Sequence, residues 1–407
     1  MGSAEAAVFC SNLATNLHSA PFLNSNLPKL NLFSIPPPKA YSFPSIRCRP
    51  VLGSPVFGAS PSSDGTHVMV EDDLQAFLQI LPLDLRGILI DEPKRDKLLE
   101  VILDLGRLPE ARYLGEPGGQ YLRNTEVSMK ELEDAQNAVG EFGGDNRAGI
   151  EGTLHRISAI RSRKGEIVGL TCRVGRAVSG HIDMVHDLLH YGKSILFVGR
   201  PGVGKTTVMR EIARVLSDEF HKRVVIVDTS NEMGGDGNIP HAAIGGARRL
   251  QVPEPSLQHK VMIEAIENHM PEVIVVDEIS TEAEALACRS IAERGVMLIA
   301  TAHGERLENI MKNPTLSNLI GGIETVTLGD EEARARRCKK SVLERKGPPT
   351  FYFLIEMRER HYWITHRTEK SVDMLLRQRN PLVEVRKRDN QFKIVVERWK
   401  PYDGHDI

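Results

Sequence analysis

The pattern of apolar residues predicts two kinds of structure along the chain. Between residues 181 and 330, short β-branched apolar runs end at Val198, Val227, Val276 and Ala300, with a weaker run at 326–328. Helix-period segments lie between most of them, at 207–220, 256–269 and 281–294. Strands that alternate with helices form a parallel sheet with helices on both faces. We therefore expect an α/β core over residues 181–330.

The preceding segment, residues 68–180, has a mixed pattern. Its predicted elements are helices at 74–81, 95–105 and 131–139, and a hairpin of strands at 154–160 and 167–173. A Gly/Pro-containing segment at 107–123 and a loop at Gly143–Gly144 separate them. This pattern predicts a small α+β domain in front of the core.

Beyond the core, residues 331–370 are first basic and then β-like, which predicts a C-terminal β-containing extension of the core. Residues 371–407 are interpreted as a charged tail. The basic cluster Arg334–Lys340 could bind nucleic acid or an anionic membrane surface, but a solvated helix face is the favoured interpretation.

The first 63 residues have the composition of a targeting segment. Glu5 is their only acidic residue, serine and proline recur, and Pro36–Pro38 excludes a regular helix. Such a segment is typical of a plastid transit peptide, and an ordinary disordered tail is the alternative. The whole chain of 407 residues has a formal net charge of −2 and no apolar stretch long enough for a bilayer, so we expect a soluble protein with at most peripheral membrane contact.

The segment from Gly199 to Thr206 fits the phosphate-binding pattern G-x-x-x-x-G-K-[ST], between a predicted strand and a predicted helix. Backbone N–H groups of such a loop surround a phosphate, and Lys205 adds a positive charge. The Thr206 hydroxyl can bind Mg²⁺. The expected cofactors are ATP and Mg²⁺. The expected binding residues are Gly199, Arg200, Pro201, Gly202, Val203, Gly204, Lys205, Thr206 and Thr207.

Acidic residues follow two of the predicted strands. Asp277 ends one strand, where it can hold Mg²⁺ opposite Thr206, and Glu278 can orient or deprotonate the attacking water. Asp228 and Glu232 follow another strand and are further candidate metal ligands. The alternatives are a structural acid pair at 277–278 and an Asp228 that only caps a turn.

A third strand ends at Thr301, two residues before His303. His303 could distinguish a triphosphate from a diphosphate, and a satisfied surface or core histidine is the alternative. Residues 234–237 and 245–249 form a long glycine-rich loop, and its Arg248 or Arg249 could act on the nucleotide of a neighbouring subunit. Arg289 and Arg294 compete for that role, and solvated surface arginines are the alternative.

Two other patterns are set aside. His186 and His190 are one helical turn apart but lack the glutamate of a metalloprotease motif. The cysteines, Cys172, Cys288 and Cys338 beyond the leader, suggest neither a disulfide framework nor a zinc site.

Several stretches together resemble the secretion-type ATPases of the RecA-like class, and more narrowly the stage III sporulation protein AA group with its plastid relatives. They are 104–107, 231–241, 301–304 and 319–322, together with the phosphate loop and the acids. The resemblance implies a RecA-like (ASCE) P-loop core behind a smaller N-terminal domain and assembly as a homo-oligomer, with the hexameric ring as the usual form. It also implies a module for single-stranded nucleic acid, for which residues up to Ile407 offer no match, so nucleic acid is not the favoured partner.

The expected function is therefore Mg²⁺-dependent ATP hydrolysis in the plastid, coupled to conformational work with an unidentified plastid protein. Two alternatives remain: a nucleotide-gated scaffold with slow turnover, and a RecA-like nucleic-acid motor.

Overall fold

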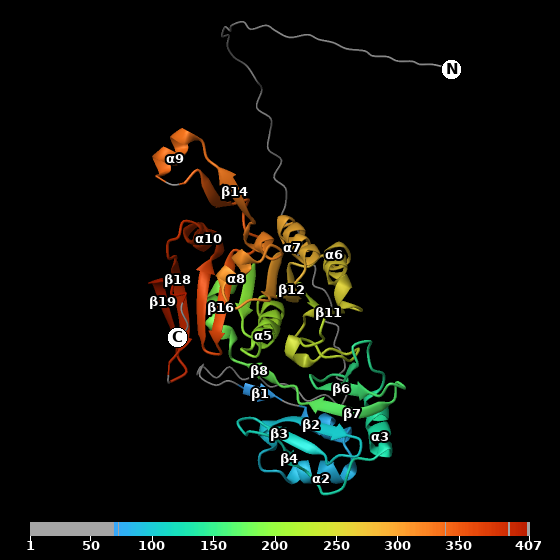
Figure 1. Cartoon of the computed structure of the whole chain (residues 1–407). Coiled ribbons are helices and arrows are strands. Elements are labelled where there is room, and N and C mark those ends of the chain that lie inside the picture. The colour runs from blue at the N-terminus through green and yellow to red at the C-terminus, as the bar shows by residue number, and fades with distance from the viewer. Residues whose placement is uncertain (1–68, 72, 338, 390, 405–407) are drawn as a thin grey trace, which may run out of the picture. The chain divides into compact units, whose positions relative to one another are not determined.

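The computed structural model describes residues 69–404 except 72, 338 and 390 (Figure 1). The expected transit peptide, residues 1–63, lies outside the described residues. The described residues form a six-stranded sheet, a nine-stranded sheet and two two-stranded sheets. In this part of the chain no helix combines the length and apolar character that a bilayer crossing needs.

The N-terminal region, residues 69–179, contains the six-stranded antiparallel sheet in the order β4-β3-β2-β7-β6-β5. Its strands are β2 (Leu98–Asp104), β3 (Glu110–Tyr113), β4 (Gln120–Tyr121), β5 (Arg147–Gly149), β6 (Arg156–Arg161) and β7 (Ile167–Arg173). Its helices are α1 (Leu74–Gln79), α2 (Leu83–Asp91), η1 (Arg95–Lys97) and α3 (Met129–Val139). Apolar side chains of α1, α2 and α3 form one core with the sheet, among them Phe77, Leu85 and Leu132. The predicted helices at 74–81 and 131–139 and the predicted hairpin are confirmed.

The helix predicted at 95–105 is wrong, because Leu98–Asp104 is strand β2 between β3 and β7. Its pairing with β3 shifts register between Leu98 and Glu100, so Leu98, Val101 and Leu103 are the buried side chains. An irregularity of this kind places residues three apart on the same face. The spacing then resembles a helical period, which explains the error.

The nine-stranded sheet has the order β11-β10-β12-β13-β9-β16-β17-β18-β19, parallel from β11 to β16 and antiparallel beyond. Its strands are β9 (Ile195–Gly199), β10 (Val224–Asp228), β11 (Arg248–Gln251), β12 (Val273–Ile279), β13 (Met297–Ala302), β16 (Phe353–Glu359), β17 (Tyr362–Arg367), β18 (Leu382–Arg388) and β19 (Ile394–Pro401). The helices around it are η2 (Ile182–Met184), α4 (His186–Leu189), α5 (Lys205–Asp218), η3 (Ala242–Ile244), η4 (Pro255–Leu257), α6 (Gln258–His269), α7 (Glu282–Glu293), α8 (Leu307–Lys312), η5 (Ser317–Ile320) and α10 (Thr368–Leu376).

Both faces of this sheet are covered. Alternate residues of β9, β10, β12, β13 and β16 contribute to two separate apolar cores. Phe197 of β9 belongs to the core that contains α5, and its neighbour Val198 belongs to the core that contains residues of α6, α7 and α8. Parallel strands buried on both faces read as continuous apolar runs. This is why the four strong runs in the sequence are all strands of the sheet, and the α/β prediction is confirmed.

The C-terminal part differs from the expectation. Residues 371–407, interpreted as a charged tail, contain most of α10 and the strands β18 and β19 of the nine-stranded sheet. One face of this charged segment is buried. Val383, Val385 and Tyr402 form a small core there. The buried Arg386 forms ion pairs with Asp187 and Glu384. Charged residues that are paired in this way obscure the alternation of a strand.

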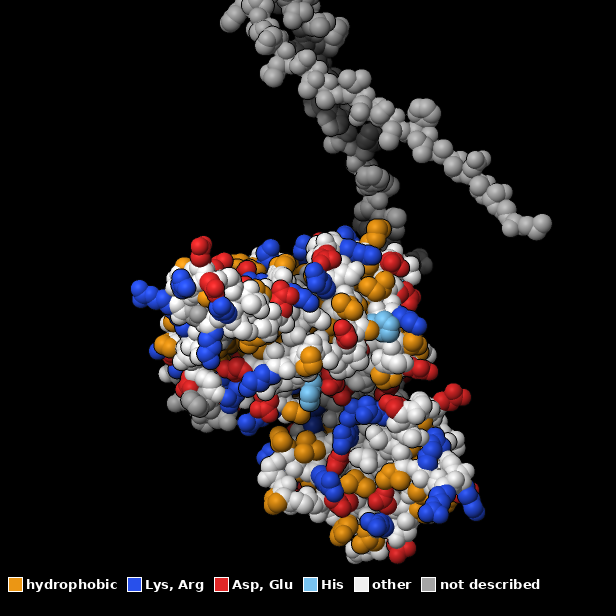
Figure 2. All heavy atoms as spheres, turned by 45° about the horizontal axis from the view of Figure 1, so that its top comes forward, with side chains coloured by type: hydrophobic (Ala, Val, Ile, Leu, Met, Phe, Trp, Pro, Cys, Tyr) orange, Lys and Arg blue, Asp and Glu red, His pale blue; other side chains and the backbone are white. Residues whose placement is uncertain are grey.

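The weak run at 326–328 is also not a core strand. β14 (Ile323–Thr327) pairs only with β15 (Ser341–Arg345), and with α9 (Asp330–Arg336) these strands extend from the sheet as an arm (Figure 1). Within the basic cluster of this arm, Arg336 forms ion pairs with Glu332 and Glu344. These contacts support a solvated, charged helix face. Basic and acidic side chains are likewise interspersed over the face of the molecule in Figure 2.

The last two short strands, β1 (Met69–Glu71) and β8 (Ala177–Ser179), form an antiparallel pair at the junction between the N-terminal region and the nine-stranded sheet.

Candidate active site

The phosphate-loop motif lies between β9 and α5, as the pattern requires. Gly202 and Gly204 have φ values of +82° and +99°, which L side chains rarely adopt. Gly199 is needed for another reason: a methyl group there would lie 2.5 Å from the Met357 carbonyl oxygen of β16. Helix α5 begins at Lys205, so the N–H groups of its first turn face the loop.

Lys205 folds back over the loop. Its Nζ donates to the carbonyl oxygens of Gly199 at 2.7 Å and Arg200 at 3.0 Å. Burial lowers the pKa of this half-buried ammonium group, and the carboxylates of Asp277 and Glu278 act in the opposite direction. The lysine therefore lies within the electrostatic field of the two strand-end acids.

Asp277, near the end of β12, connects two hydroxyl groups. Thr301 Oγ1 donates to Asp277 Oδ1 at 2.8 Å, and Thr206 Oγ1 lies 3.4 Å from Oδ2. Burial raises the pKa of this carboxyl, while the hydrogen bond from Thr301 lowers it. The phosphate-loop threonine and the strand-end acid are thus brought together as predicted.

Glu278 occupies an unusual backbone position. Its φ is +51°, in the left-handed region, and its N–H donates to Thr301 Oγ1 at 2.7 Å. The pairing of β12 with β13 shifts register between Val276 and Ile279, and the Glu278 side chain is exposed while its neighbours are buried. Such a backbone costs of the order of 1–3 kcal/mol and persists where surrounding contacts enforce it.

Two residues that hold these acids had not been assigned a role. Thr301 connects Asp277 and the Glu278 backbone, and its place at the end of β13 next to His303 was the available signal. Gln258, the first residue of α6, is buried, and its Nε2 donates to the Asp277 carbonyl oxygen at 3.1 Å. No local motif marks this glutamine.

Asp228 ends β10, next to β12, and is fully buried. Its Oδ2 accepts from the N–H groups of Met233 at 3.2 Å and Gly234 at 2.8 Å, so it holds the turn that follows. Among the described residues its Oδ1 is buried without a hydrogen-bond partner. Burial raises the pKa of Asp228 to about 6. Oδ2 of Asp228 is therefore occupied by the turn, and the role of Asp228 as a metal ligand stays a prediction.

Glu232 points to a different neighbour. Its carboxylate forms an ion pair with Arg156 of β6 at 2.9 Å. Arg210 of α5, which is buried, donates from Nε to the Met233 carbonyl oxygen at 2.8 Å and from Nη2 to the Glu232 carbonyl oxygen. The carboxylate of Glu232 thus pairs with the N-terminal region, and its role as a metal ligand stays a prediction.

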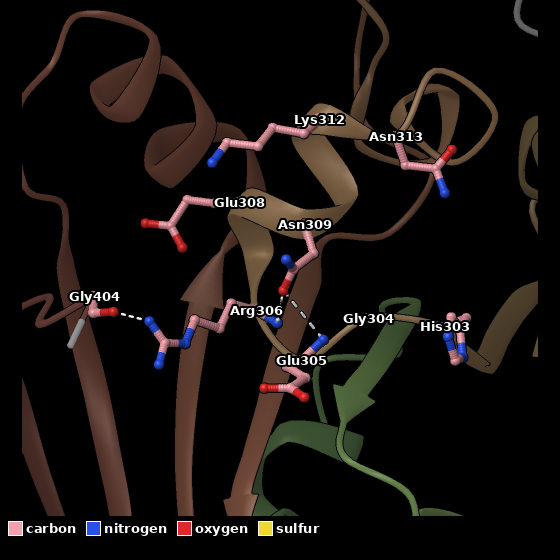
Figure 3. Close-up of a pocket in the computed structure, with 9 residues that line it drawn as sticks. All are labelled: His303, Gly304, Glu305, Arg306, Glu308, Asn309, Lys312, Asn313 and Gly404. Atoms are coloured by element: carbon pink, nitrogen blue, oxygen red, sulfur yellow. Dashed lines mark hydrogen bonds between the residues drawn. The ribbon is translucent and has the colours of Figure 1, made fainter. Parts of the chain in front are cut away.

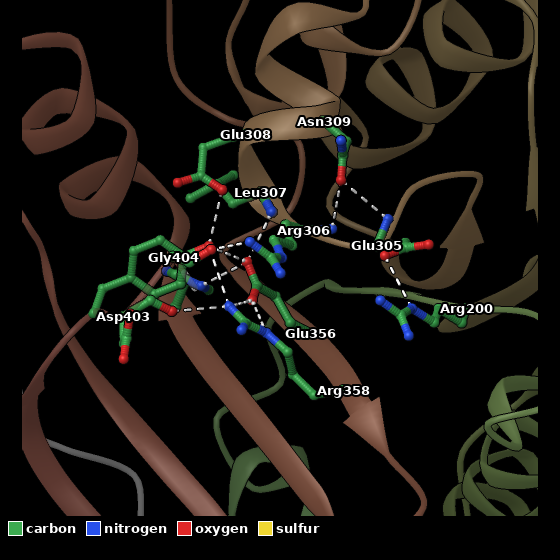
Figure 4. Close-up of polar contacts among 12 residues, drawn as sticks. Arg200, Glu305, Arg306, Leu307, Glu308, Asn309, Glu356, Arg358, Asp403 and Gly404 are labelled. Atoms are coloured by element: carbon green, nitrogen blue, oxygen red, sulfur yellow. Dashed lines mark hydrogen bonds and ion pairs between the residues drawn. The ribbon is translucent and has the colours of Figure 1, made fainter. Parts of the chain in front are cut away.

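His303 is exposed and lines a cavity of about 810 Å³ with residues of α8, including Asn309 and Lys312 (Figure 3). The loop after His303 contacts the phosphate loop: the Gly199 N–H donates to the Gly304 carbonyl oxygen at 2.7 Å. Glu305 and Arg200 form an ion pair at 3.1 Å (Figure 4). The strand-end loop that carries His303 is thus joined to the phosphate loop.

Behind this loop lies a buried polar network that sequence reasoning missed (Figure 4). Glu356 of β16 accepts from the Leu307 N–H at 2.8 Å and from Tyr402 Oη at 3.0 Å. It forms an ion pair with Arg358, and its Oε1 lies 3.2 Å from His366 Nε2. Burial opposes its ionisation, yet His366 and these partners lower the pKa of Glu356 to about 2. The carboxylate fixes the start of α8.

The candidate arginines are placed apart from the phosphate loop. Arg249 donates to the carbonyl oxygens of Gly234, Gly235, Gly237 and Asn238, so it holds the glycine-rich loop of its own chain. Arg248 lies 3.4 Å from a ring nitrogen of His269. Arg289 and Arg294 form ion pairs with Glu293 and Glu267. A role for any of them at a neighbouring nucleotide stays a prediction.

His186 and His190 pack against each other and against Phe220, with ring centroids 4.9–5.8 Å apart. Within the described residues no group of three or more His, Cys, Asp and Glu side chains is arranged to hold a metal. Both histidines therefore belong to a ring cluster.

The parallel sheet, the loop between β9 and α5 and the acids at the ends of neighbouring strands define a RecA-like P-loop protein. The chain belongs to the family described as sporulation stage III, protein AA, whose model matches residues 120–347.

The chain is also similar to curated proteins of an alga and a plant. The chain is 57% identical over 331 residues to the uncharacterized protein ycf45 of Porphyra purpurea, covering 81% of this chain and 58% of the relative. It is 54% identical over 355 residues to the Arabidopsis thaliana protein Seedling Plastid Development 1, covering 85% and 52%. The chain thus spans about half the length of these relatives. Among solved structures it resembles the ATPase DotB of Legionella pneumophila, with 14% identity, a TM-score of 0.44, and coverage of 71% of this chain and 82% of that chain.

Proposed function

We propose that this protein binds ATP with Mg²⁺ and hydrolyses it at the edge of the sheet formed by the ends of β9, β12 and β13. The observation that carries the proposal is the contact between the phosphate loop and the strand-end acid: Thr206 Oγ1 lies 3.4 Å from Asp277 Oδ2. In open parallel sheets, ligands bind outside the carboxyl ends of the strands.

The residues at this edge fit a magnesium ion that keeps several water ligands. Thr206 offers a hydroxyl and Asp277 a carboxylate, the hard oxygen donors that Mg²⁺ prefers. Because Mg²⁺ uses one or two carboxylates and substrate phosphates, a cage of three protein carboxylates is not needed. When bound, the ion neutralises charge on the β- and γ-phosphates.

The protein groups divide the remaining work. Lys205, which now binds the carbonyl groups of Gly199 and Arg200, can turn to the β- and γ-phosphates. Glu278 has an exposed carboxylate on a fixed backbone, so it can orient a water molecule and accept its proton. Thr301 holds Asp277 and the Glu278 backbone together.

The protein works in the plastid, where its plant and algal relatives belong. We propose that it acts there as a homo-oligomer, with hydrolysis coupled to conformational change in a plastid protein partner. The chain-internal contacts that support coupling are those of Gly304 and Glu305 with the phosphate loop.

Two variants test this function. Lys205→Ala should abolish tight ATP binding, measured by calorimetry, whereas the exposed Lys193→Ala should bind as the unaltered protein does. Glu278→Gln should bind ATP and lose roughly 10²–10⁴ in turnover, with the exposed Glu264→Gln as control.

The outcome also separates the alternative functions. Turnover below about 10⁻³ s⁻¹ in the assembled protein, comparable to unassisted GTPases, would favour a nucleotide-gated scaffold. Stimulation by single-stranded DNA or RNA would favour a nucleic-acid motor. Wild-type hydrolysis by Glu278→Gln would remove Glu278 from the mechanism.

A further inference from the structure

Loop 231–238, which follows β10 and contains the first glycines of the glycine-rich loop, lies directly against the turn 149–153, which begins at the last residue of β5. A methyl group added at Gly237 would lie 2.6 Å from Glu151 Cα, and one at Gly235 would lie 2.1 Å from the Thr153 carbonyl oxygen. From the opposite side, a methyl group at Gly149 would lie 2.3 Å from Asp236 Cβ. Glycines therefore occur on both sides of this contact, where backbone approaches backbone.

Polar contacts hold the loop in this position. Arg156 of β6 forms the ion pair with Glu232 at 2.9 Å, and Asn231 Nδ2 donates to Asp236 Oδ1. Arg249 of β11 donates to carbonyl oxygens along the loop, and Gln251 Nε2 donates to the Asp236 carbonyl oxygen at 3.0 Å. The loop is thus bound to the N-terminal region on one side and to the nine-stranded sheet on the other.

The start of the same loop is bonded to the candidate active site. Asp228, beside Asp277 on the neighbouring strand, accepts from the N–H groups of Met233 and Gly234. Arg210, on the helix that begins with Lys205, donates to the carbonyl oxygens of Glu232 and Met233. A displacement of Asp228 or of α5 therefore acts on the loop through four hydrogen bonds.

We propose that loop 231–238 is a coupling loop, which transmits the nucleotide state of the active site to the N-terminal region through its close contact with the turn 149–153. The three glycines make the contact tight enough that a shift of the loop must displace the turn, because packed backbone has no side chain to absorb the movement. This inference rests on the proposed function and names the element through which that function reaches the rest of the chain.

Two alanine variants test the contact from opposite sides. Gly237→Ala and Gly149→Ala each place a methyl group against backbone or Cβ of the partner segment, at positions without a positive φ. Gly144→Ala and Gly329→Ala are matched controls, because added methyl groups there have no neighbour within 4 Å. Hydrogen exchange of the turn 149–153 would be measured with and without Mg²⁺ and the β,γ-imido analogue of ATP.

In the unaltered protein and both controls, the nucleotide should change the exchange rate of the turn. In Gly237→Ala and Gly149→Ala that response should be lost while the dissociation constant for the nucleotide stays within about threefold, a difference below 1 kcal/mol. A response that survives in both glycine variants overturns the inference, and so does an unaltered protein that binds the nucleotide without any change at the turn. An unaltered protein that binds no nucleotide overturns the proposed function as well.

A charge pair provides the test if the glycine variants do not fold. Arg156→Glu should reduce the response of the turn, because it places two carboxylates together. The exchanged pair Arg156→Glu with Glu232→Arg should restore at least part of it. Arg156→Glu with a full response, or an exchanged pair no better than the single variant in a protein that binds nucleotide, contradicts the coupling loop.

Discussion

The ends of β10 and β12 lie side by side and each presents a buried aspartate, yet the two carboxylates are held differently. Asp277 on β12 is contacted by the hydroxyl groups of Thr301 and Thr206. Asp228 on β10 is held by backbone N–H groups at one oxygen, and its other oxygen is buried without a partner among the described residues. Hydroxyl groups can turn and exchange partners, whereas backbone N–H groups fix a loop. Neighbouring acids at one sheet edge can therefore have different roles: Asp277 faces the phosphate-loop threonine, and Asp228 fixes the loop after β10.

A third buried carboxylate, Glu356 on β16, differs from Asp228 because both of its oxygens have polar partners. Its two oxygens have five polar contacts, from Leu307, Tyr402, His366 and Arg358, the last of which donates two. Its pKa falls to about 2, whereas the pKa of Asp228 rises to about 6. Burial raises the pKa of both carboxyl groups: at Asp228 it outweighs the backbone hydrogen bonds, whereas at Glu356 it is outweighed by His366, Leu307 and Arg358.

Breaking the network of Glu356 should give the largest effect on stability. Glu356→Gln removes the buried carboxylate that pairs with Arg358 and accepts from the Leu307 N–H, and breaking a buried ion pair typically costs about 3–5 kcal/mol. Because the folded-state pKa is lowered, the wild-type contribution is complete above pH 4.5 and is lost as the pH falls toward 2. Denaturant unfolding at pH 7 measures the loss. The exposed Glu359→Gln should change stability by less than about 0.5 kcal/mol, and an equally small change in Glu356→Gln would contradict this account.

Replacing each of the two neighbouring aspartates, Asp277 on β12 and Asp228 on β10, by asparagine should affect ATP hydrolysis to different extents. Asp277→Asn removes the charge opposite Thr206 and should lower Mg²⁺-dependent hydrolysis by roughly 10²–10³, the cost typical of losing one preorganised group. Steady-state turnover at saturating ATP measures it. A smaller fall in Asp277→Asn than in Asp228→Asn would reverse the assignment.

Asp228→Asn should stabilise the fold in a pH-dependent way. The raised pKa means that ionised Asp228 costs stability: the cost is absent below pH 3.8, grows as the pH rises, and is complete above about pH 6. A rise from 3.8 to about 6 corresponds to roughly 2–3 kcal/mol. The free energy of unfolding would be measured at pH 5 and pH 8, and the stability advantage of the variant over the wild type should be larger at pH 8. A constant difference between the two would show that Asp228 does not titrate in this range.

The smallest effect should come from the hydroxyl that joins Asp277 to Glu278. Thr301→Val leaves the Glu278 N–H and Asp277 Oδ1 without this partner, which costs about 1–3 kcal/mol. Hydrolysis should fall while ATP binding is kept, and Thr301→Ser, which retains the hydroxyl, should recover most of the rate. If Ser and Val behave alike, packing and not the hydrogen bond explains the position.

The central part of the molecule could be predicted from the sequence because its signals are local. The phosphate loop, α5 and the acids after β12 each depend on a few consecutive residues, and parallel strands buried on both faces leave uninterrupted apolar runs. The contact of Thr206 with Asp277 follows from joining two such local signals at one sheet edge.

The remaining features depend on contacts between distant segments. The register shift in β2 imitates a helical period, and the paired Arg386 in β18 hides a strand inside a charged segment. The role of Arg249 could not be read from its position, because its partners are the carbonyl oxygens of the glycine-rich loop. Glu356 carries no motif, since its importance comes from partners on β17, α8 and the segment after β19.

The strand order has a consequence for how the chain is made. β9, which carries the phosphate loop, lies between β13 and β16, and both are synthesised much later. The six-stranded sheet, in contrast, is complete once β7 has been made. The N-terminal region can therefore fold from segments that are close in sequence, whereas β9 can pair only after the chain has brought β13 and β16 beside it, and its apolar residues stay exposed until then.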